Sequence, residues 1–313
     1  MKVTVKTMRD AFIEGLYGKM AHNDDIFFIT ADLGAPALDR IRHDFKDRFI
    51  NVGIAEQNLV NVATGLALEG YAVYAYAIAP FLTMRAYEQI RTNLSISSQI
   101  RPVNVNLIGV GAGLSYVVSG PTHHCLEDIA IMRLLPNFVV FSPCDWTIAQ
   151  HFVQYSTEVK IPKYLRFDGK ALPVIYDKFD SSMMEDGFCE LLKGCNICLV
   201  STGYMTHVAL AAAQKVKNTG VIDVFLLKPF NAVKLYETLK EYEYILSIEE
   251  AFLNSGGLDS LILNLLNKNR ALSKLKSLGF KDNHVFNHGS RDYLHQVYGL
   301  DEEAVVSAIR KCV

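Results

Sequence analysis

Three glycine-bearing segments carry the residue types that could do chemistry in this sequence. They are ADLGAP (31–36), NVGIAEQN (51–58) and GVGAGLSYVVSGPTHH (109–124). Glu56 in the second segment could exchange a proton, as could His123 and His124 in the third. None of the segments is a P-loop or a G-x-G-x-x-G followed by a suitably placed acid, so motifs indicate no nucleotide site.

Each of these residues also has a purely structural explanation. Glu56 stands at the expected start of a helix, where acidic side chains are common because they offset the helix dipole. His123 and His124 follow Gly120-Pro121 and could make local hydrogen bonds within a loop. Residue type and spacing therefore leave both catalytic and structural roles open.

Alternating helical and extended patterns indicate how the three segments are positioned. In the first half, helical periodicity covers Thr7–His22, Ala55–Glu69, Thr83–Ser97, Leu126–Leu134 and Trp146–Ser156. Short apolar strands alternate with these helices at Ile26–Thr30, Ala72–Ile78, Val103–Ile108, Phe138–Phe141 and Lys163–Phe167. This alternation predicts a mostly parallel sheet covered on both faces. Ligands of such sheets bind at the carboxyl ends of the strands, where we expect the glycine-bearing loops.

A second domain is expected after a polar, turn-rich connection at residues 168–194. A new alternation follows at Ile197–Ser201, Thr206–Val216, Val221–Leu226, Val233–Lys240, Tyr244–Glu249, Gly257–Leu266 and Glu302–Lys311. We therefore predict an α/β protein, with a parallel-sheet domain over residues 1–178 and a smaller α/β domain over residues 190–313.

Composition argues against several classes of partner. The formal net charge is −2, and the basic residues are scattered, so no basic stripe for nucleic acid is expected. The chain start lacks an apolar signal core, and the longest apolar stretch, Tyr71–Leu82, is too short to span a bilayer. We expect a cytoplasmic protein without membrane contact. The six cysteines lack paired metal spacing, and the lone Cys195-x-x-Cys198 leads into a strand, so no metal site is expected.

Several longer motifs, in order, resemble one enzyme family. Four of them are ITADLGAP, DRFINVGIAEQNLVNVATGLALEGY, FLTMRAYEQIR and SGPTHHCLEDIAIMRLLPNFVVFSPCD. They resemble the pyrimidine-binding domain shared by transketolase and deoxyxylulose-phosphate synthase, which depend on thiamine diphosphate. The second half, with LVSTGYMTHVALAA, VFLLKPF, LSIEEAFLNSGGLDS and NHGSRDYLHQVYGLDEE, is similar to the C-terminal domain of the same enzymes.

The resemblance also implies a partner chain. Transketolases bind Mg²⁺ and the cofactor diphosphate through a Gly-Asp-Gly segment of an N-terminal domain, and this sequence contains no Gly-Asp-Gly. We therefore expect the C-terminal subunit of a split transketolase-like transferase, which moves a two-carbon ketol unit between sugars. Its separate N-terminal subunit would hold the diphosphate and Mg²⁺, in a heterotetramer with two copies of each chain.

The resemblance implies roles for particular residues in cofactor binding and catalysis. Glu56 matches the catalytic glutamate that hydrogen-bonds N1′ of the aminopyrimidine and shares a proton with it. Phe81 matches the phenylalanine that stacks on the pyrimidine, and Ile78 and Met84 occupy the other two positions of that pocket. His123 matches the substrate-facing histidine of Gly-Pro-Thr-His and is preferred to His124.

The substrate positions depart from the transketolase pattern. Ser119 stands where the family has an aspartate that contacts a donor hydroxyl. Arg9 matches one arginine of the phosphate clamp, and Lys170 lies near the position of the second. Gly169 stands at about the position of that second arginine, and Pro36 and Gly111 stand at the clamp's serine and loop histidine. A clamp with few charged donors should hold a phosphate weakly, so we expect sugars that are unphosphorylated or linked to another carrier.

Two other functions stay open from the sequence. One is the β subunit of a 2-oxo-acid dehydrogenase, which the Gly-Pro-Thr-His-His loop and the synthase-like second half argue against. The other is a catalytically silent regulatory subunit, in which Glu56 and His123 would be remnants. Deoxyxylulose-phosphate synthase itself is disfavoured because it is normally one chain and because Ala112 stands at its characteristic loop arginine.

Overall fold

The computed structural model describes residues 6–312, which divide by their contacts into two compact units. Unit 1 contains the chain up to Ala112 together with Ile131–Phe141 and Asp145–Phe179. Unit 2 contains Gly113–Ala130, Ser142–Cys144 and the chain from Asp180. The predicted limits of 1–178 and 190–313 describe two continuous pieces, whereas 113–130 groups with unit 2. That segment does so because Leu114, Val117 and Leu126 are buried in the core of unit 2.

The sheet of unit 1 is parallel, as the alternation predicted. Its strands run in the order β5-β6-β4-β3-β1-β2, and each pair of neighbours is parallel. The strands are β1 (Ile26–Thr30), β2 (Phe49–Asn51), β3 (Ala72–Ile78), β4 (Val105–Val110), β5 (Val139–Phe141) and β6 (Lys163–Phe167). Because β3, β4 and β6 are almost completely buried, they consist mainly of apolar residues.

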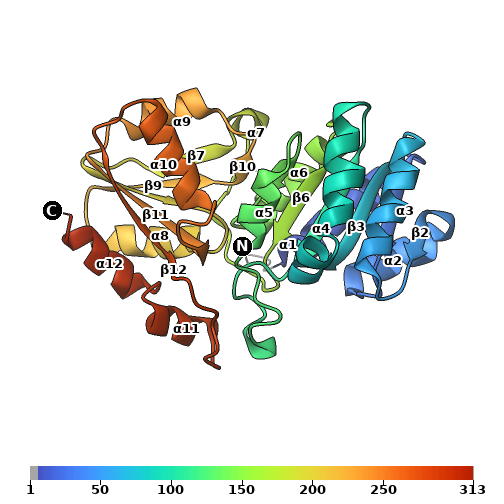
Figure 1. Ribbon diagram of the computed structural model, residues 1–313, viewed down its shortest axis with the longest axis horizontal. Helices are drawn as coiled ribbons and strands as arrows, with labels where there is room; N and C mark the ends of the chain where they lie inside the picture. The colour runs from blue at the N-terminus through green and yellow to red at the C-terminus, as the bar shows by residue number, and fades with distance from the viewer. Residues whose placement is uncertain (1–5, 313) are drawn as a thin grey trace. The chain divides into compact units, whose positions relative to one another are not determined.

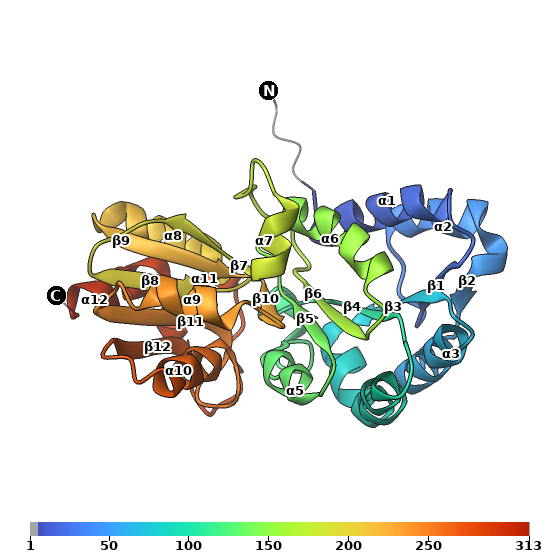
Figure 2. The same cartoon turned by 90° about the horizontal axis from the view of Figure 1, so that it is seen from above.

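Helices cover both faces of this sheet, with α1, α2 and α6 on one face and α3 on the other (Figures 1 and 2). The α-helices of this part of the chain are α1 (Met8–Met20), α2 (Pro36–Asp44), α3 (Glu56–Leu68), α4 (Tyr87–Gln89), α5 (Asp128–Leu134) and α6 (Trp146–Glu158). Side chains of Thr7 and Asp145 cap α1 and α6 by accepting backbone N–H groups, which fixes where these helices begin.

The helical segment after β3 differs from the α-helix predicted at Thr83–Ser97. It consists of wide π turns at Phe81–Arg85 and Ile90–Ile96, with the short α4 between them. Thr83 Oγ1 donates to the carbonyl of Ala79 at 2.8 Å, a side-chain bond to the preceding turn that helical periodicity does not reveal. Such wide turns often occur at functional sites.

Unit 2 has a second sheet, of order β12-β11-β8-β9-β7, in which only the β7–β9 pair of the described strands is antiparallel. Helices α9 and α10 lie on one face, and α8 and α12 on the other (Figure 1). The strands are β7 (Phe188–Leu192), β8 (Ile197–Ser201), β9 (Thr219–Val224), β11 (Tyr244–Phe252) and β12 (Lys274–Phe280), and a short β10 (Leu226–Lys228) follows β9. The helices are α7 (Ser181–Asp186), α8 (Met205–Lys215), α9 (Ala232–Leu239), α10 (Leu258–Lys268), α11 (Arg291–Tyr298) and α12 (Glu302–Arg310).

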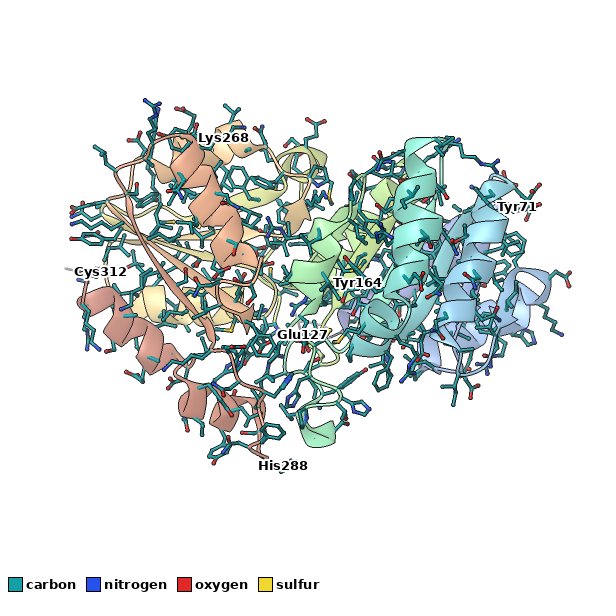
Figure 3. The ribbon with its side chains drawn as sticks, in the orientation of Figure 1. Tyr71, Glu127, Tyr164, Lys268, His288 and Cys312 are labelled. Atoms are coloured by element: carbon teal, nitrogen blue, oxygen red, sulfur yellow. The ribbon has the colours of Figure 1, made fainter. Side chains whose placement is uncertain are left out.

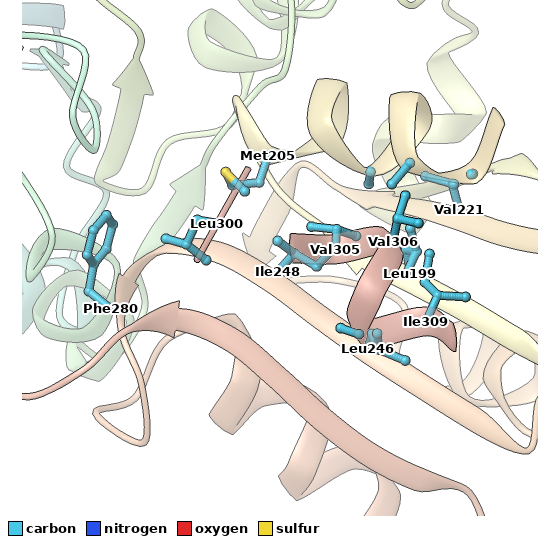
Figure 4. Packing of buried hydrophobic residues seen from close by; sticks show 14 of the residues in the cluster. Leu199, Met205, Val221, Leu246, Ile248, Phe280, Leu300, Val305, Val306 and Ile309 are labelled. Atoms are coloured by element: carbon cyan, nitrogen blue, oxygen red, sulfur yellow. The ribbon is translucent and has the colours of Figure 1, made fainter. Parts of the chain in front are cut away.

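Apolar side chains from α12 and the central strands form the core of unit 2. Val305, Val306 and Ile309 of α12 pack with Leu199 of β8 and Leu246 of β11, all fully or almost fully buried (Figure 4). Burying these side chains is the main driving force for docking α12 on the sheet.

Residues 168–194 contain more structure than the predicted connection. Helix α7 begins after Asp180, whose side chain caps it, and ends at Gly187 with φ +76°. Strand β7 then pairs antiparallel with β9. The sequence prediction missed both because α7 is short and β7 is only partly buried, so neither has sustained apolar periodicity.

Among residues 6–312, no helix combines the length and the apolar character that crossing a bilayer requires.

Candidate active site

Hydrogen bonds between two strand-end loops of unit 1 position the start of α3. Oδ1 of Asn51, at the end of β2, accepts the backbone N–H groups of Asp32 and Gly53, each at 3.0 Å. Its Nδ2 donates to Oδ1 of Asp32 at 2.9 Å. Asp32 and Gly53 both have positive φ, at 54° and 76°, which sharp turns require. Asn51 therefore ties the loop after β1 to the turn that leads to Glu56.

Glu56 is the first residue of α3 and is only 4% exposed. Burying a carboxylate is unfavourable unless it has a partner, and Arg85 supplies one by donating from Nη1 to Oε2 at 3.0 Å. An acid that only offsets the helix dipole would be stabilised equally well at the surface. Stabilisation of the helix dipole therefore does not explain why Glu56 is buried.

The π turn after β3 brings an aromatic ring to the same guanidinium group. Cζ of Arg85 lies 5.2 Å from the centre of the Phe81 ring, so the guanidinium contacts both Phe81 and Glu56. Ile78, at the end of β3, is half-buried, and Met84 is 39% exposed. The sequence analysis did not single out Arg85. The sequence feature that could have identified Arg85 is its position four residues after Phe81 in the motif FLTMRAYEQIR.

The two basic residues predicted to bind substrate differ in their surroundings. Arg9 donates from Nε to Oδ1 of Asp10 at 2.8 Å and from Nη2 to Oδ2 at 3.2 Å. Burial lowers the pKa of Arg9, but hydrogen bonding to Asp10 and the nearby Tyr76 outweigh burial and raise it. Lys170 is exposed. Part of the guanidinium fork of Arg9 is thus already engaged by a carboxylate.

Ser119 and His123 belong to unit 2, on the loop 113–125. Ser119 is exposed at the end of a 3₁₀ turn, Val117–Ser119. His123 is half-buried, with Nδ1 at 3.0 Å from Oγ1 of Thr122. His124 is only 4% exposed, and burial lowers its pKa despite the Val117 carbonyl and the Glu250 carboxylate, which raise it. A buried imidazole whose neutral form is favoured is compatible with a packing role, and the preference for His123 stays a prediction.

The predicted site residues are thus divided between the two units. Those of unit 1 are Arg9, Glu56, Ile78, Phe81, Met84 and Lys170, and those of unit 2 are Ser119 and His123. Within residues 6–312, no group of three or more His, Cys, Asp or Glu side chains is arranged to hold a metal ion.

Comparisons with known proteins match both halves of the chain. Residues 5–174 match the family model of the transketolase pyrimidine-binding domain, and residues 189–305 match that of the transketolase C-terminal domain. One subunit of the apulose-4-phosphate transketolase of Actinobacillus succinogenes is 31% identical over 96% of this chain and 96% of its own. The 1-deoxy-D-xylulose-5-phosphate synthase of Syntrophus aciditrophicus is 32% identical over 92% of this chain but 44% of its own.

A solved structure has the same fold over nearly the whole chain. It is described as a split gene transketolase, inactive β4 tetramer, and it has a TM-score of 0.85 and 30% identity. The match covers 97% of this chain and 97% of that chain. The resemblance found in the motifs is therefore confirmed for both the pyrimidine-binding and the C-terminal domain.

Proposed function

Because the chain belongs to the transketolase family, we propose that it is the C-terminal subunit of a two-chain enzyme that transfers a two-carbon ketol unit between sugars. The buried Glu56, whose partner Arg85 also lies against the Phe81 ring, inside the region that matches the pyrimidine-binding domain, is the observation that carries this proposal. A carboxyl group and an aromatic ring held close together are what an aminopyrimidine site needs.

The side chains of unit 1 fit the aminopyrimidine of thiamine diphosphate. The flat, nitrogen-bearing guanidinium of Arg85 already lies against Phe81 and hydrogen-bonds Glu56, so this surface accepts a planar polar group. In the bound enzyme, Phe81 would offer its ring face, with Ile78 and Met84 as apolar neighbours. The carboxyl of Glu56 would hold a proton toward N1′. The cofactor, when bound, supplies the electron sink for breaking and forming a carbon–carbon bond beside a carbonyl.

A separate partner subunit completes the proposed enzyme. The relative from A. succinogenes is named as a subunit of a transketolase and matches this chain along its length, whereas the single-chain synthase is more than twice as long as the matched part. The similar split-gene transketolase was solved as an inactive β4 tetramer. We propose that the partner holds the diphosphate and Mg²⁺ and that each complex contains two copies of each chain. We also propose that the complex acts in the cytoplasm.

The remaining predicted residues are proposed to face the sugar substrates. His123 would hydrogen-bond the oxygens of the donor sugar, and Ser119 a donor hydroxyl, while Arg9 and Lys170 would lie toward the far end of the substrate. The match to the transketolase C-terminal domain favours this assignment over a 2-oxo-acid dehydrogenase β subunit.

Calorimetric titration with thiamine diphosphate and Mg²⁺ tests the proposal. The isolated chain should bind the cofactor weakly and show no ketol transfer, and addition of the Gly-Asp-Gly-bearing partner should restore both. A partner whose Gly-Asp-Gly aspartate is changed to alanine is the control and should restore neither. Tight, Mg²⁺-dependent binding by the isolated chain would refute the split enzyme, and a complex that binds cofactor without transfer would identify a silent subunit.

A further inference from the structure

Two adjacent carboxylates on β11, Glu249 and Glu250, are buried in unit 2 and have different partners. Glu249 accepts the backbone N–H groups of Leu258 at 2.7 Å and Asp259 at 2.8 Å, so it caps the start of α10. The two residues are 0% and 2% exposed, which makes them a matched pair with different contacts.

Glu250 is held by two side chains of α11. It accepts Nε of Arg291 at 2.8 Å and a second bond from Nη2, and it contacts Nε2 of His295 at 2.6 Å. Burial raises the pKa of Glu250, but Arg291 and His295 together outweigh burial and hold it well below its usual range. Cζ of Arg291 in turn lies 3.5 Å from the centre of the Tyr204 ring. The carboxylate is therefore ionised and held in one orientation.

The same carboxylate contacts the start of the loop that carries His123. We call this part, Gly113 and Leu114, the neck of the loop. The backbone N–H of Leu114 points to Oε2 of Glu250 at 3.4 Å. Gly113 has φ +56°, and a Cβ atom there would lie 2.0 Å from Oε2, so a larger residue could not keep this approach. Gly113 and Cys125 exchange backbone hydrogen bonds at 3.1 and 2.9 Å, which close the loop 113–125.

The rest of this loop is also built on unit 2. Val117 and Leu126 are buried in its core. A Cβ atom at Gly120 would lie 3.6 Å from Cε1 of His288, in the segment before α11. Figure 3 labels His288 and also Glu127, which follows the loop. The loop therefore takes its position from β11, α11 and the core of unit 2.

We propose that Glu250 is a positioning residue for ketol transfer, which acts by holding the neck of the loop 113–125 and thereby the place of His123. The predicted effect of Glu250 on the reaction rests on the proposed function. It gives the C-terminal domain a part in the chemistry that runs through the loop 113–125.

The first test compares Glu250→Gln with Glu249→Gln in the assembled enzyme. Glu250→Gln keeps the side-chain shape but removes the charge that holds Arg291, so the loop should shift and kcat should fall roughly 10–100-fold. The rate of proton exchange at C2 of the cofactor is proposed to depend on Glu56 and not on the loop. This rate should therefore change by less than about twofold in Glu250→Gln. Glu249→Gln changes the α10 cap and should leave kcat unchanged. Equal losses in the two variants would overturn the proposal.

A double-mutant cycle with His123 tests whether Glu250 acts through the loop. In a His123→Ala background, Glu250→Gln should lower kcat/KM by no more than about twofold, because the residue being positioned is gone. Independent, multiplicative losses would show that Glu250 acts elsewhere.

Hydrogen exchange gives a measurement that needs no activity. The amides of Leu114 and Cys125 should exchange at least about tenfold faster in Glu250→Gln and at the wild-type rate in Glu249→Gln. Should Glu250→Gln fail to fold, Gly113→Ala is expected to loosen the same amides by displacing the neck. Unchanged exchange in the folded variants would refute the anchoring. Faster exchange in a complex whose wild type transfers no ketol unit would contradict the proposed function while supporting the anchoring.

Discussion

Nη1 of Arg85 lies 3.0 Å from Oε2 of Glu56, and the same guanidinium lies 5.2 Å from the centre of the Phe81 ring. A positive side chain thus contacts both groups that are proposed to bind the aminopyrimidine. Arg85 is 52% exposed, whereas Glu56 is 5% exposed in its side chain, so the arginine can move into solvent more easily than the carboxylate can. If the proposed site is correct, cofactor binding would require Arg85 to give up part of this contact.

Arg85→Met should strengthen thiamine diphosphate binding to the assembled enzyme, because the competing contact is removed. Arg85 is half exposed, so solvent screens this contact and we expect a gain of about fivefold, equivalent to ~1 kcal/mol. Arg91→Met removes a charge from an exposed residue of the same helical segment and is the matched control. Weaker cofactor binding by Arg85→Met would show that Arg85 helps to bind the cofactor rather than competing with it.

Glu56→Gln should lower turnover by at least about 100-fold, because an amide cannot hold the proton that a carboxyl shares with N1′. The amide oxygen can still accept the bond from Arg85, so the thermal midpoint and assembly with the partner should change little. Turnover and proton exchange at C2 measure the effect, and Glu69→Gln, at the exposed C-cap of α3, is the control. An unchanged exchange rate would remove Glu56 from the mechanism.

Phosphorylated and unphosphorylated ketoses should be used with similar efficiency. Arg9 is engaged by Asp10, Lys170 is exposed, and Pro36 stands at a clamp position. Kinetics of the assembled complex with matched donors measure the kcat/KM advantage for phosphate, which should be small and must stay below about 1,000-fold, or ~4 kcal/mol. A larger advantage would show that a strong phosphate site exists, either on this chain or on the partner.

His124 should make unfolding depend on pH in the neutral range. Its pKa is lowered from 6.5 by burial, with His123 and His288 also lowering it and Glu250 raising it. The unfolded chain therefore binds more protons than the folded chain near that pH, so stability is complete above about 6.5 and is lost as the pH falls. Thermal midpoints between pH 5 and 8 should decline less steeply in His124→Leu than in the wild type. His22→Leu, which removes an exposed imidazole, is the control; equal slopes in wild type and His124→Leu would contradict the prediction.

Local patterns were sufficient where a strand is buried on both faces. The predicted limits of β1, β3, β6 and β8 agree with the structure, because parallel strands covered by helices are mainly apolar and therefore stand out as short apolar runs. Strand β12 (Lys274–Phe280) was missed because it lies at the edge of the sheet, where β11 is its partner among the described strands, and because two lysines interrupt its apolar pattern. Helix α11 was also missed, because it is short and because Leu294 and His295 are its only buried residues.

The sequence by itself determined the family, the α/β fold of both halves and the residues of the pyrimidine-binding motifs, since these depend on short strings and on local periodicity. Only the tertiary structure decided that Arg85 contacts Glu56, 29 residues away, and that Glu250 contacts Leu114, 136 residues away. Local spacing carries no information about such pairs, because the contact depends on how complete strands and helices pack. The motif also could not predict that His123 lies on a loop that contacts β11, because that contact likewise joins residues far apart in the sequence.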